Sequence, residues 1–154
     1  MKFLMSCLAA LCLVGCASTS TYQKEGAASD TEATATFIRS TPASSAQNLQ
    51  IDIDTAKAAT LANNAHVTLK VPEGKRAVRL DWPLISTQAK LEMPLEFKAR
   101  TIRYFVVMDA KTDAKGLGDR ALSVATNESI AVYEVPEQIA TVMMSASTGA
   151  PANP

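Results

Sequence analysis

The chain has 154 residues, and its 15 basic and 15 acidic side chains give a formal net charge of zero. A balanced charge without basic runs argues against a nucleic-acid-binding protein and against an electrostatic membrane-binding face. The length suits one domain of about a hundred residues plus tails, which can bury a core without disulfides or metals. All three cysteines lie within residues 1–16, so a disulfide inside the domain is excluded.

The first fifteen residues have the layout of a secretory signal peptide. Lys2 supplies the positive charge, residues 3–14 form a short apolar stretch, and the small Gly15 precedes the expected cleavage point. The stretch is too short for a transmembrane helix, which needs about 20 apolar residues to cross ~30 Å of hydrocarbon. The run Leu13-Val14-Gly15-Cys16, followed by Ala17, resembles the lipobox of bacterial lipoproteins.

The lipobox resemblance implies that residues 1–15 are removed and that Cys16 is the lipidation site. In bacterial lipoproteins this cysteine receives a diacylglycerol and a further acyl chain, such as palmitate. Two or three chains anchor a protein durably, because each buried methylene contributes about 0.8 kcal/mol whereas one chain binds only marginally. Alanine after the cysteine, rather than aspartate, matches lipoproteins sorted to the outer membrane. We therefore expect a lipid-anchored protein of the bacterial outer membrane, with its domain in the periplasm.

Both ends of the mature chain are poor in large apolar residues. Residues 16–33 contain no large aliphatic side chain and one aromatic, Tyr22. Such a segment buries too little surface to offset its ordering entropy, so we predict a flexible tether with a mean reach of roughly 20–25 Å. Residues 145–154 are small, polar and proline-bearing, and we predict a disordered tail. The folded domain is expected to span residues 34–144.

Alternation of apolar and polar residues is the main pattern between these ends and predicts β-strands. The turn residues Pro72-Glu73-Gly74-Lys75 lie between two such runs, which predicts a hairpin. Pro94 cannot donate to a ladder, so its strand is expected at a sheet edge or with that nitrogen facing outward. The alternating runs are residues 34–39, 49–54, 65–71, 78–82 and 91–98.

The second half of the chain departs from simple alternation. Residues 102–108 are apolar on both faces, which is typical of a central strand with both faces covered, and residues 109–120 are expected to form a loop. A second hairpin is predicted around Asn127-Glu128. Two segments fit either a helix or a strand, residues 55–62 and 138–144. Seven or eight short strands with turn signals predict an all-β fold, an antiparallel sandwich or small barrel.

The run from Val71 to Lys75, followed by Val78 and Leu80, resembles the signature of PEGA-type sandwich domains. With the opening strand 33–39 and the later run Tyr104-Phe105-Val106-Val107, the chain is also similar to a domain-of-unknown-function family of small bacterial lipoproteins. The similarity covers about residues 34–108, although residues 99–101 stand where that family has a glycine. It implies an immunoglobulin-like or prealbumin-like antiparallel β-sandwich, and it supplies no catalytic residues.

The candidates for catalysis or metal binding are few. His66 is the only histidine, and alternation places it on a polar strand face, so we expect a solvated side chain rather than a zinc ligand or catalytic base. Asp52 and Asp54 share a strand face, with Asp81 nearby, and such carboxylates suit calcium binding or acid–base chemistry. The segment around them lacks further oxygen ligands and a glycine bend. We therefore expect solvated or turn-capping carboxylates, and no metal or cofactor.

Two further groups are candidates for binding. Trp82, Tyr104 and Phe105 either line a ligand pocket or form the core, and the core is the more common role. Basic residues interleaved with Glu92 and Glu96 either meet an acidic polymer or form a mixed solvated surface, which we favour. These basic residues are Lys75, Arg76, Lys98, Arg100 and Arg103.

These observations favour a non-enzymatic structural or interaction module, held on the membrane through Cys16 and partnered by an envelope protein. A carrier for an apolar or small ligand is the alternative, and an enzyme ranks third. A carrier predicts an apolar cavity near Trp82 and Tyr104. A scaffold predicts a filled core with an exposed apolar patch or an unpaired strand edge. An enzyme requires His66 to meet a carboxylate or hydroxyl in a cleft.

Overall fold

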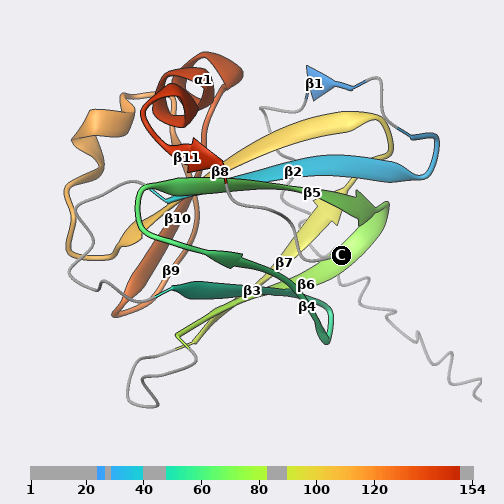
Figure 1. Cartoon of the computed structure of the whole chain (residues 1–154), viewed down its shortest axis with the longest axis horizontal. Coiled ribbons are helices and arrows are strands. Elements are labelled where there is room, and N and C mark those ends of the chain that lie inside the picture. The colour runs from blue at the N-terminus through green and yellow to red at the C-terminus, as the bar shows by residue number, and fades with distance from the viewer. Residues whose placement is uncertain (1–23, 27–28, 40–47, 83–89, 150–154) are drawn as a thin grey trace, which may run out of the picture.

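The computed structural model describes residues 24–26, 29–39, 48–82 and 90–149, which form two facing β-sheets and one α-helix (Figure 1). The expected signal peptide, Cys16 and most of the expected tether lie outside the described residues. The prediction of an all-β, sandwich-like fold is confirmed. Sheet A has the order β11-β5-β2-β8-β10-β9, with β1 also paired to β8, and sheet B has the order β4-β3-β6-β7.

The chain passes back and forth between the two sheets. Sheet A contains β1 (Lys24–Glu25), β2 (Glu32–Arg39), β5 (Ala65–Pro72), β8 (Thr101–Asp109), β9 (Leu122–Thr126), β10 (Ile130–Glu134) and β11 (Thr148–Gly149). Sheet B contains β3 (Leu49–Ile53), β4 (Ala56–Leu61), β6 (Gly74–Asp81) and β7 (Leu91–Phe97). The pairs are antiparallel except β2 with β8 and β11 with β5, which are parallel. A fully antiparallel sandwich was expected, so these two pairs are a correction.

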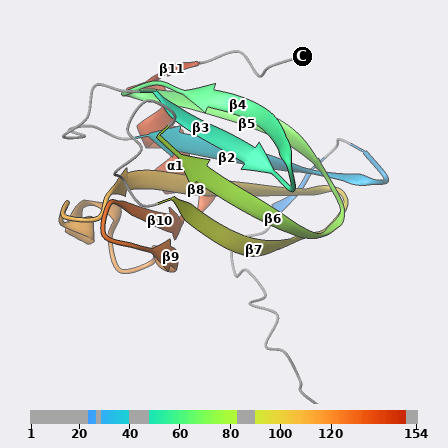
Figure 2. The ribbon, with the colours of Figure 1, turned by 90° about the horizontal axis from the view of Figure 1, so that it is seen from below.

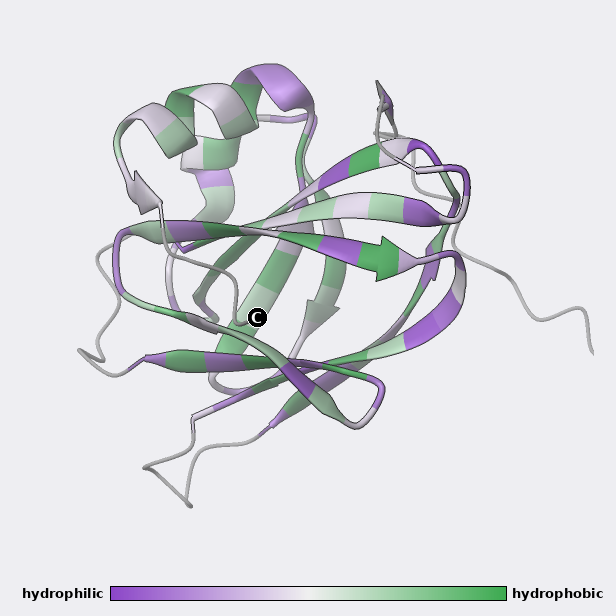
Figure 3. Ribbon diagram, turned by 45° about the vertical axis from the view of Figure 1, so that its right-hand side comes forward, coloured by the Kyte–Doolittle hydropathy of each residue, from purple (hydrophilic) through white to green (hydrophobic). Residues whose placement is uncertain are grey.

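The main core lies between the two sheets. Alternation turns one face of each strand inward, and hydrophobic and hydrophilic segments alternate along the ribbons in Figure 3. At its centre the Phe37 and Phe105 rings stack 5.1 Å apart, and Phe97 meets Phe105 edge-on at 6.5 Å. Phe105 belongs to sheet A and Phe97 to sheet B, so these rings join the two layers.

Sheet A has a second apolar layer on its outer face. Helix α1 (Glu137–Ser145) and the 3-10 turn η1 (Ala114–Leu117) cover Ile38, Tyr104 and their neighbours there. The expectation that residues 102–108 form a central strand covered on both faces is confirmed, because β8 lies between β2 and β10 and is buried throughout its middle.

The two ambiguous segments now have definite structures. Residues 56–61 form strand β4, which pairs with β3 after a turn at Asp54, whose φ of 56° lies in the left-handed region. Residues 137–145 form helix α1, which begins after Pro136. Its buried Ala140 and half-buried Met143 and Met144 recur at helical spacing toward the outer cluster, so packing on sheet A selects the helix.

The predicted hairpin at Pro72–Lys75 is wrong. Strands β5 and β6 flank this turn, but β5 pairs in sheet A and β6 in sheet B, so the turn carries the chain across the sandwich (Figure 2). Gly74 has a φ of 109°, which favours glycine, and the Glu73 N–H donates to the Thr31 carbonyl at 3.0 Å. Alternation fixes which face of a strand is buried but not which strand it pairs with. The other hairpin, β9 with β10, and the edge position of Pro94 in β7 are confirmed.

Paired strands and the helix extend beyond the expected domain limits of 34 and 144. Within the expected tether, β1 pairs with β8, and β2 begins at Glu32. Within the expected tail, Ser145 ends α1 and Thr148–Gly149 pair with β5. Backbone pairing orders these segments without large apolar side chains, which composition could not show. Residues 150–154 lie outside the described residues.

Candidate functional site

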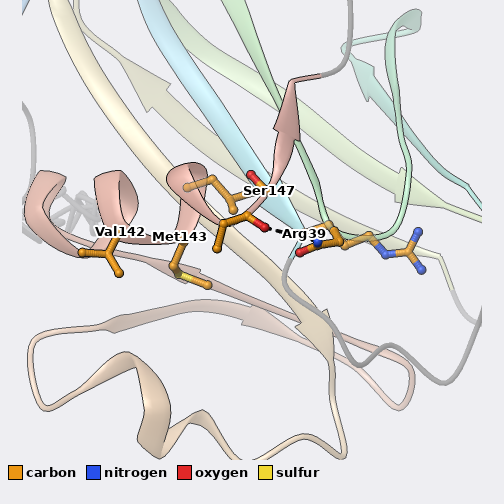
Figure 4. Close-up of a pocket in the computed structure, with 7 residues that line it drawn as sticks. Arg39, Val142, Met143 and Ser147 are labelled. Carbon is orange, nitrogen blue, oxygen red and sulfur yellow. Dashed lines mark hydrogen bonds between the residues drawn. The ribbon is translucent and has the colours of Figure 1, made fainter.

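A pocket of about 190 Å³ lies where α1 and its following turn meet the end of β2 (Figure 4). Val142, Met143 and Ala146 contribute one wall and Ile38 the other, so the lining is mainly apolar. Figure 4 shows the Arg39 side chain running away from Val142 and Met143, so its guanidinium does not enter the pocket. The Asn64 side-chain amide donates to the Ala146 carbonyl at 3.2 Å and closes one side.

His66 and Ser147 meet beside this pocket. The His66 Nδ1 and Ser147 Oγ atoms are 2.7 Å apart, and the Ser147 hydroxyl donates to the Met144 carbonyl at 3.1 Å. The expectation of a solvated histidine is therefore wrong, since His66 is half-buried and bonded. Which of the His66 Nδ1 and Ser147 Oγ atoms donates depends on the tautomer of the imidazole, and the Ser147 hydroxyl also lies against the Met144 carbonyl. A nucleophilic serine needs a hydroxyl that is directed toward a substrate, whereas this hydroxyl is bonded to the Met144 carbonyl of its own fold.

Each of the three candidate aspartates is paired with a basic side chain. Asp52, with its side chain 2% exposed, accepts from Arg79 Nε at 3.0 Å and from Gln50 at 2.7 Å. The hydrogen bond with Asp52 raises the pKa of Arg79. Asp54 lies in the following turn rather than on the strand, where it accepts from the Ala77 N–H and pairs with Arg76 at 3.2 Å. Asp81 pairs with Lys90 at 3.0 Å.

Within the described ranges, no three histidine, cysteine or carboxylate side chains gather closely enough to hold a metal ion. Asp54 lies in the turn between β3 and β4, but its side chain bonds to Ala77 of the neighbouring strand β6 rather than to an N–H of its own turn. Asp52 is a buried ion-pair partner rather than part of a solvated face.

The candidate aromatic residues do not line one pocket. Trp82 lies between the sheets, where the Arg39 guanidinium stacks 4.6 Å from its ring. Tyr104 and Phe105 are neighbours in β8, so they point to opposite faces of sheet A, and Tyr104 belongs to the outer cluster. The core role expected of these residues is confirmed, although in two separate clusters. None of them lines the pocket beside α1.

The predicted basic surface cluster is divided. Arg76 and Arg100 are tied to Asp54 and Asp30, and Lys75 and Lys98 are exposed. Arg103 is not on the surface. Its side chain is 3% exposed and makes a bidentate pair with Glu134, at 3.0 and 2.9 Å.

Arg103 is the polar residue that sequence reasoning missed most clearly. Its guanidinium also donates to the Glu96 carbonyl of sheet B at 2.9 Å and lies over the rings of Phe97 and Phe105. It therefore links both sheets inside the core. The available signal was its position two residues before Phe105, which places it on the inner face of β8.

Arg39 is a second buried cation. Its guanidinium donates to the Leu61 carbonyl at 3.3 Å and stacks on Trp82, and burial lowers its pKa to about 10. It shares the inner face of β2 with Phe37, again by alternation. Both buried arginines thus contact aromatic rings and join strands.

No protein-family model matches the chain, and comparisons with curated proteins and with solved structures find no significant match. Across the residues that the structure describes, no helix has both the length and the apolar character needed to span a membrane.

Proposed function

We propose that this protein is a lipid-anchored protein of the bacterial outer membrane. Its sandwich is a non-enzymatic module in the periplasm that binds or supports other envelope components. The single observation that carries the proposal is the run Leu13-Val14-Gly15-Cys16 after a short apolar stretch with Lys2 in front of it. The PEGA-like resemblance assigns the sandwich to the immunoglobulin-like or prealbumin-like type.

The state of the polar side chains supports a non-enzymatic role. The Arg103–Glu134 and Arg79–Asp52 pairs use their charges inside the fold. The Ser147 hydroxyl is bonded to His66 Nδ1 and to the Met144 carbonyl. Catalysis needs groups that are placed toward a substrate, and these groups are placed toward one another.

The edges of the sheets support an interaction role. Among the described strands β9 pairs only with β10, and its sequence Leu122–Thr126 has no charge and no proline. Edge strands that must avoid pairing usually carry a charge or a proline, as β7 does with Glu92 and Pro94. Leu122 is also one of the exposed large apolar residues.

The alternative function is a carrier of a small apolar ligand, which the pocket beside α1 favours. Its volume of about 190 Å³ and its lining by Ile38, Val142 and Met143 suit a compact apolar molecule. Most ligand pockets are larger, from about 300 Å³ upward, so the carrier role ranks second.

The test is an affinity purification from gently crosslinked, detergent-solubilised membranes. We expect the wild type to recover a defined envelope protein, and Cys16→Ser to recover less of it because the bait leaves the membrane. Leu122→Lys places a charge on the β9 edge and is expected to weaken recovery, whereas Ala56→Lys places the same charge on β4 and is the matched control. Recovery of no protein by a correctly localised wild type would favour the carrier.

A further inference from the structure

Strand β1, which contains the first described residues, is paired with sheet A. In β1, Lys24 pairs with Ile102 and Glu25 with Thr101, and the Gly26 N–H donates to the Arg100 carbonyl. A Cβ atom at Gly26 would lie 2.7 Å from Ile102 Cγ1, closer than packed atoms approach. A larger residue at position 26 would therefore force Ile102 or β1 itself to shift.

This docking shortens the connection to Cys16. Only residues 17–23 separate Cys16 from β1. Such a segment reaches at most about 29 Å when fully extended and about 15 Å on average as a coil. A tether running to Ala33 would reach about 60 Å when extended. A lipid on Cys16 that inserts into a membrane therefore holds the β1 end of sheet A close to that membrane.

The same side of the molecule carries helix α1. Figure 1 shows β1 and α1 both on the side of sheet A that faces away from sheet B. The apolar outer cluster joins them, because it extends from Ile102, the partner of β1, to Met143 and Met144 of α1. If the β1 end of sheet A lies close to the membrane, α1 on the same outer face of the sheet lies toward the membrane as well.

The exposed part of α1 suits a lipid interface. Val142 is 69% exposed, and the apolar pocket opens next to it. Within α1 the one charged residue is Glu137 in the first turn, so burying the surface around Val142 among lipid headgroups desolvates little charge. Lys70 is exposed on the same sheet face, which suits anionic headgroups.

We propose that docked β1 holds the outer face of sheet A against the membrane that carries the anchor, with Val142 of α1 in the lipid interface. This inference rests on the proposed lipidation of Cys16. The outer face of sheet A contacts lipid rather than another protein, because the short connection between Cys16 and β1 keeps this side of the domain nearest to the bilayer.

The test uses the lipidated full-length protein in vesicles of phosphatidylethanolamine and phosphatidylglycerol that contain a spin-labelled quenching lipid. Val142→Cys provides one free thiol, because Cys16 is acylated and Cys7 and Cys12 leave with the signal peptide. A fluorophore at this site should be quenched at least threefold more than one at Glu92→Cys, an exposed site on sheet B. Equal quenching at the two sites would overturn the inference.

A second pair of variants tests the role of β1. Gly26→Ala in the Val142→Cys protein should detach β1 and reduce the quenching difference at least twofold. Gly116→Ala, where a Cβ meets open space, should leave it unchanged. An unchanged difference in Gly26→Ala would refute orientation by β1. The intact mass measured on the same sample separates these outcomes from failure of the proposed function, which would show as a chain without acyl groups.

Discussion

Sheets A and B face the same core but differ in their outer faces. Sheet A is covered on both sides, so its central strand β8 is apolar in both directions. Among the described residues, apolar side chains cover only the inner face of sheet B, and its strands β6 and β7 alternate between buried and more exposed residues. The outer apolar layer that α1 and η1 form on sheet A therefore explains why β8 departs from simple alternation of apolar and polar residues. The packing of the two sheets against each other does not require it.

The two faces of β2 offer the sharpest test, because Phe37 and Ile38 are adjacent and both fully buried. Phe37→Ala opens a cavity between two sheets and should cost about 4 kcal/mol of unfolding free energy. Ile38→Ala opens a cavity under α1, a helix that can shift, and should cost about 2–3 kcal/mol. Urea denaturation measures both values. Equal losses would mean that the outer layer is as rigid as the core.

The ion pairs of the two sheets should differ in the same direction. Glu134→Gln leaves Arg103 buried with its charge unmatched and should cost about 3 kcal/mol. Asp52→Asn leaves Arg79, whose side chain is 38% exposed, in contact with water, so the loss should be clearly smaller. Thermal denaturation of the two variants measures the difference. The comparison fails if Asp52→Asn lowers the melting temperature as much as Glu134→Gln does.

The turn that joins the two sheets depends on Gly74. Because its φ is 109°, Gly74→Ala should cost about 1–2 kcal/mol. Gly116→Ala, at a position without positive φ or close neighbours, serves as the matched control and should change stability little. A neutral Gly74→Ala would show that the turn can relax into an ordinary conformation.

The smallest expected effect is a pH dependence at Arg39. Burial lowers the pKa of Arg39 to about 10 in the folded state, so the unfolded chain binds more protons above that pH and stability should rise. Relative to Arg39→Met, the wild type should gain about 1 kcal/mol between pH 9 and pH 11. Chemical denaturation at the two pH values measures this gain. A constant difference would place the Arg39 charge in contact with solvent.

The sequence patterns predicted which face of a strand is buried better than they predicted which strands pair with each other. The covered strand β8 and the edge proline Pro94 followed from local rules, since burial on each face is visible in the alternation. The crossing of the chain from β5 to β6 was not predictable from the turn residues. Arg103 and its partner Glu134 are far apart in sequence, so their pairing depended on the sheet order. The contact between His66 and Ser147 could not be predicted either, because these two residues are also far apart in sequence.

The lipid anchor on Cys16 is the central claim, and the intact mass of the protein purified from membranes tests it most directly. The claim predicts a chain that begins at Cys16 and carries the mass of a diacylglycerol and an N-linked acyl chain. Cys16→Ser should remain unprocessed and unmodified. A wild-type chain that still contains residues 1–15, or that begins elsewhere without lipid, would contradict the anchor and every orientation derived from it.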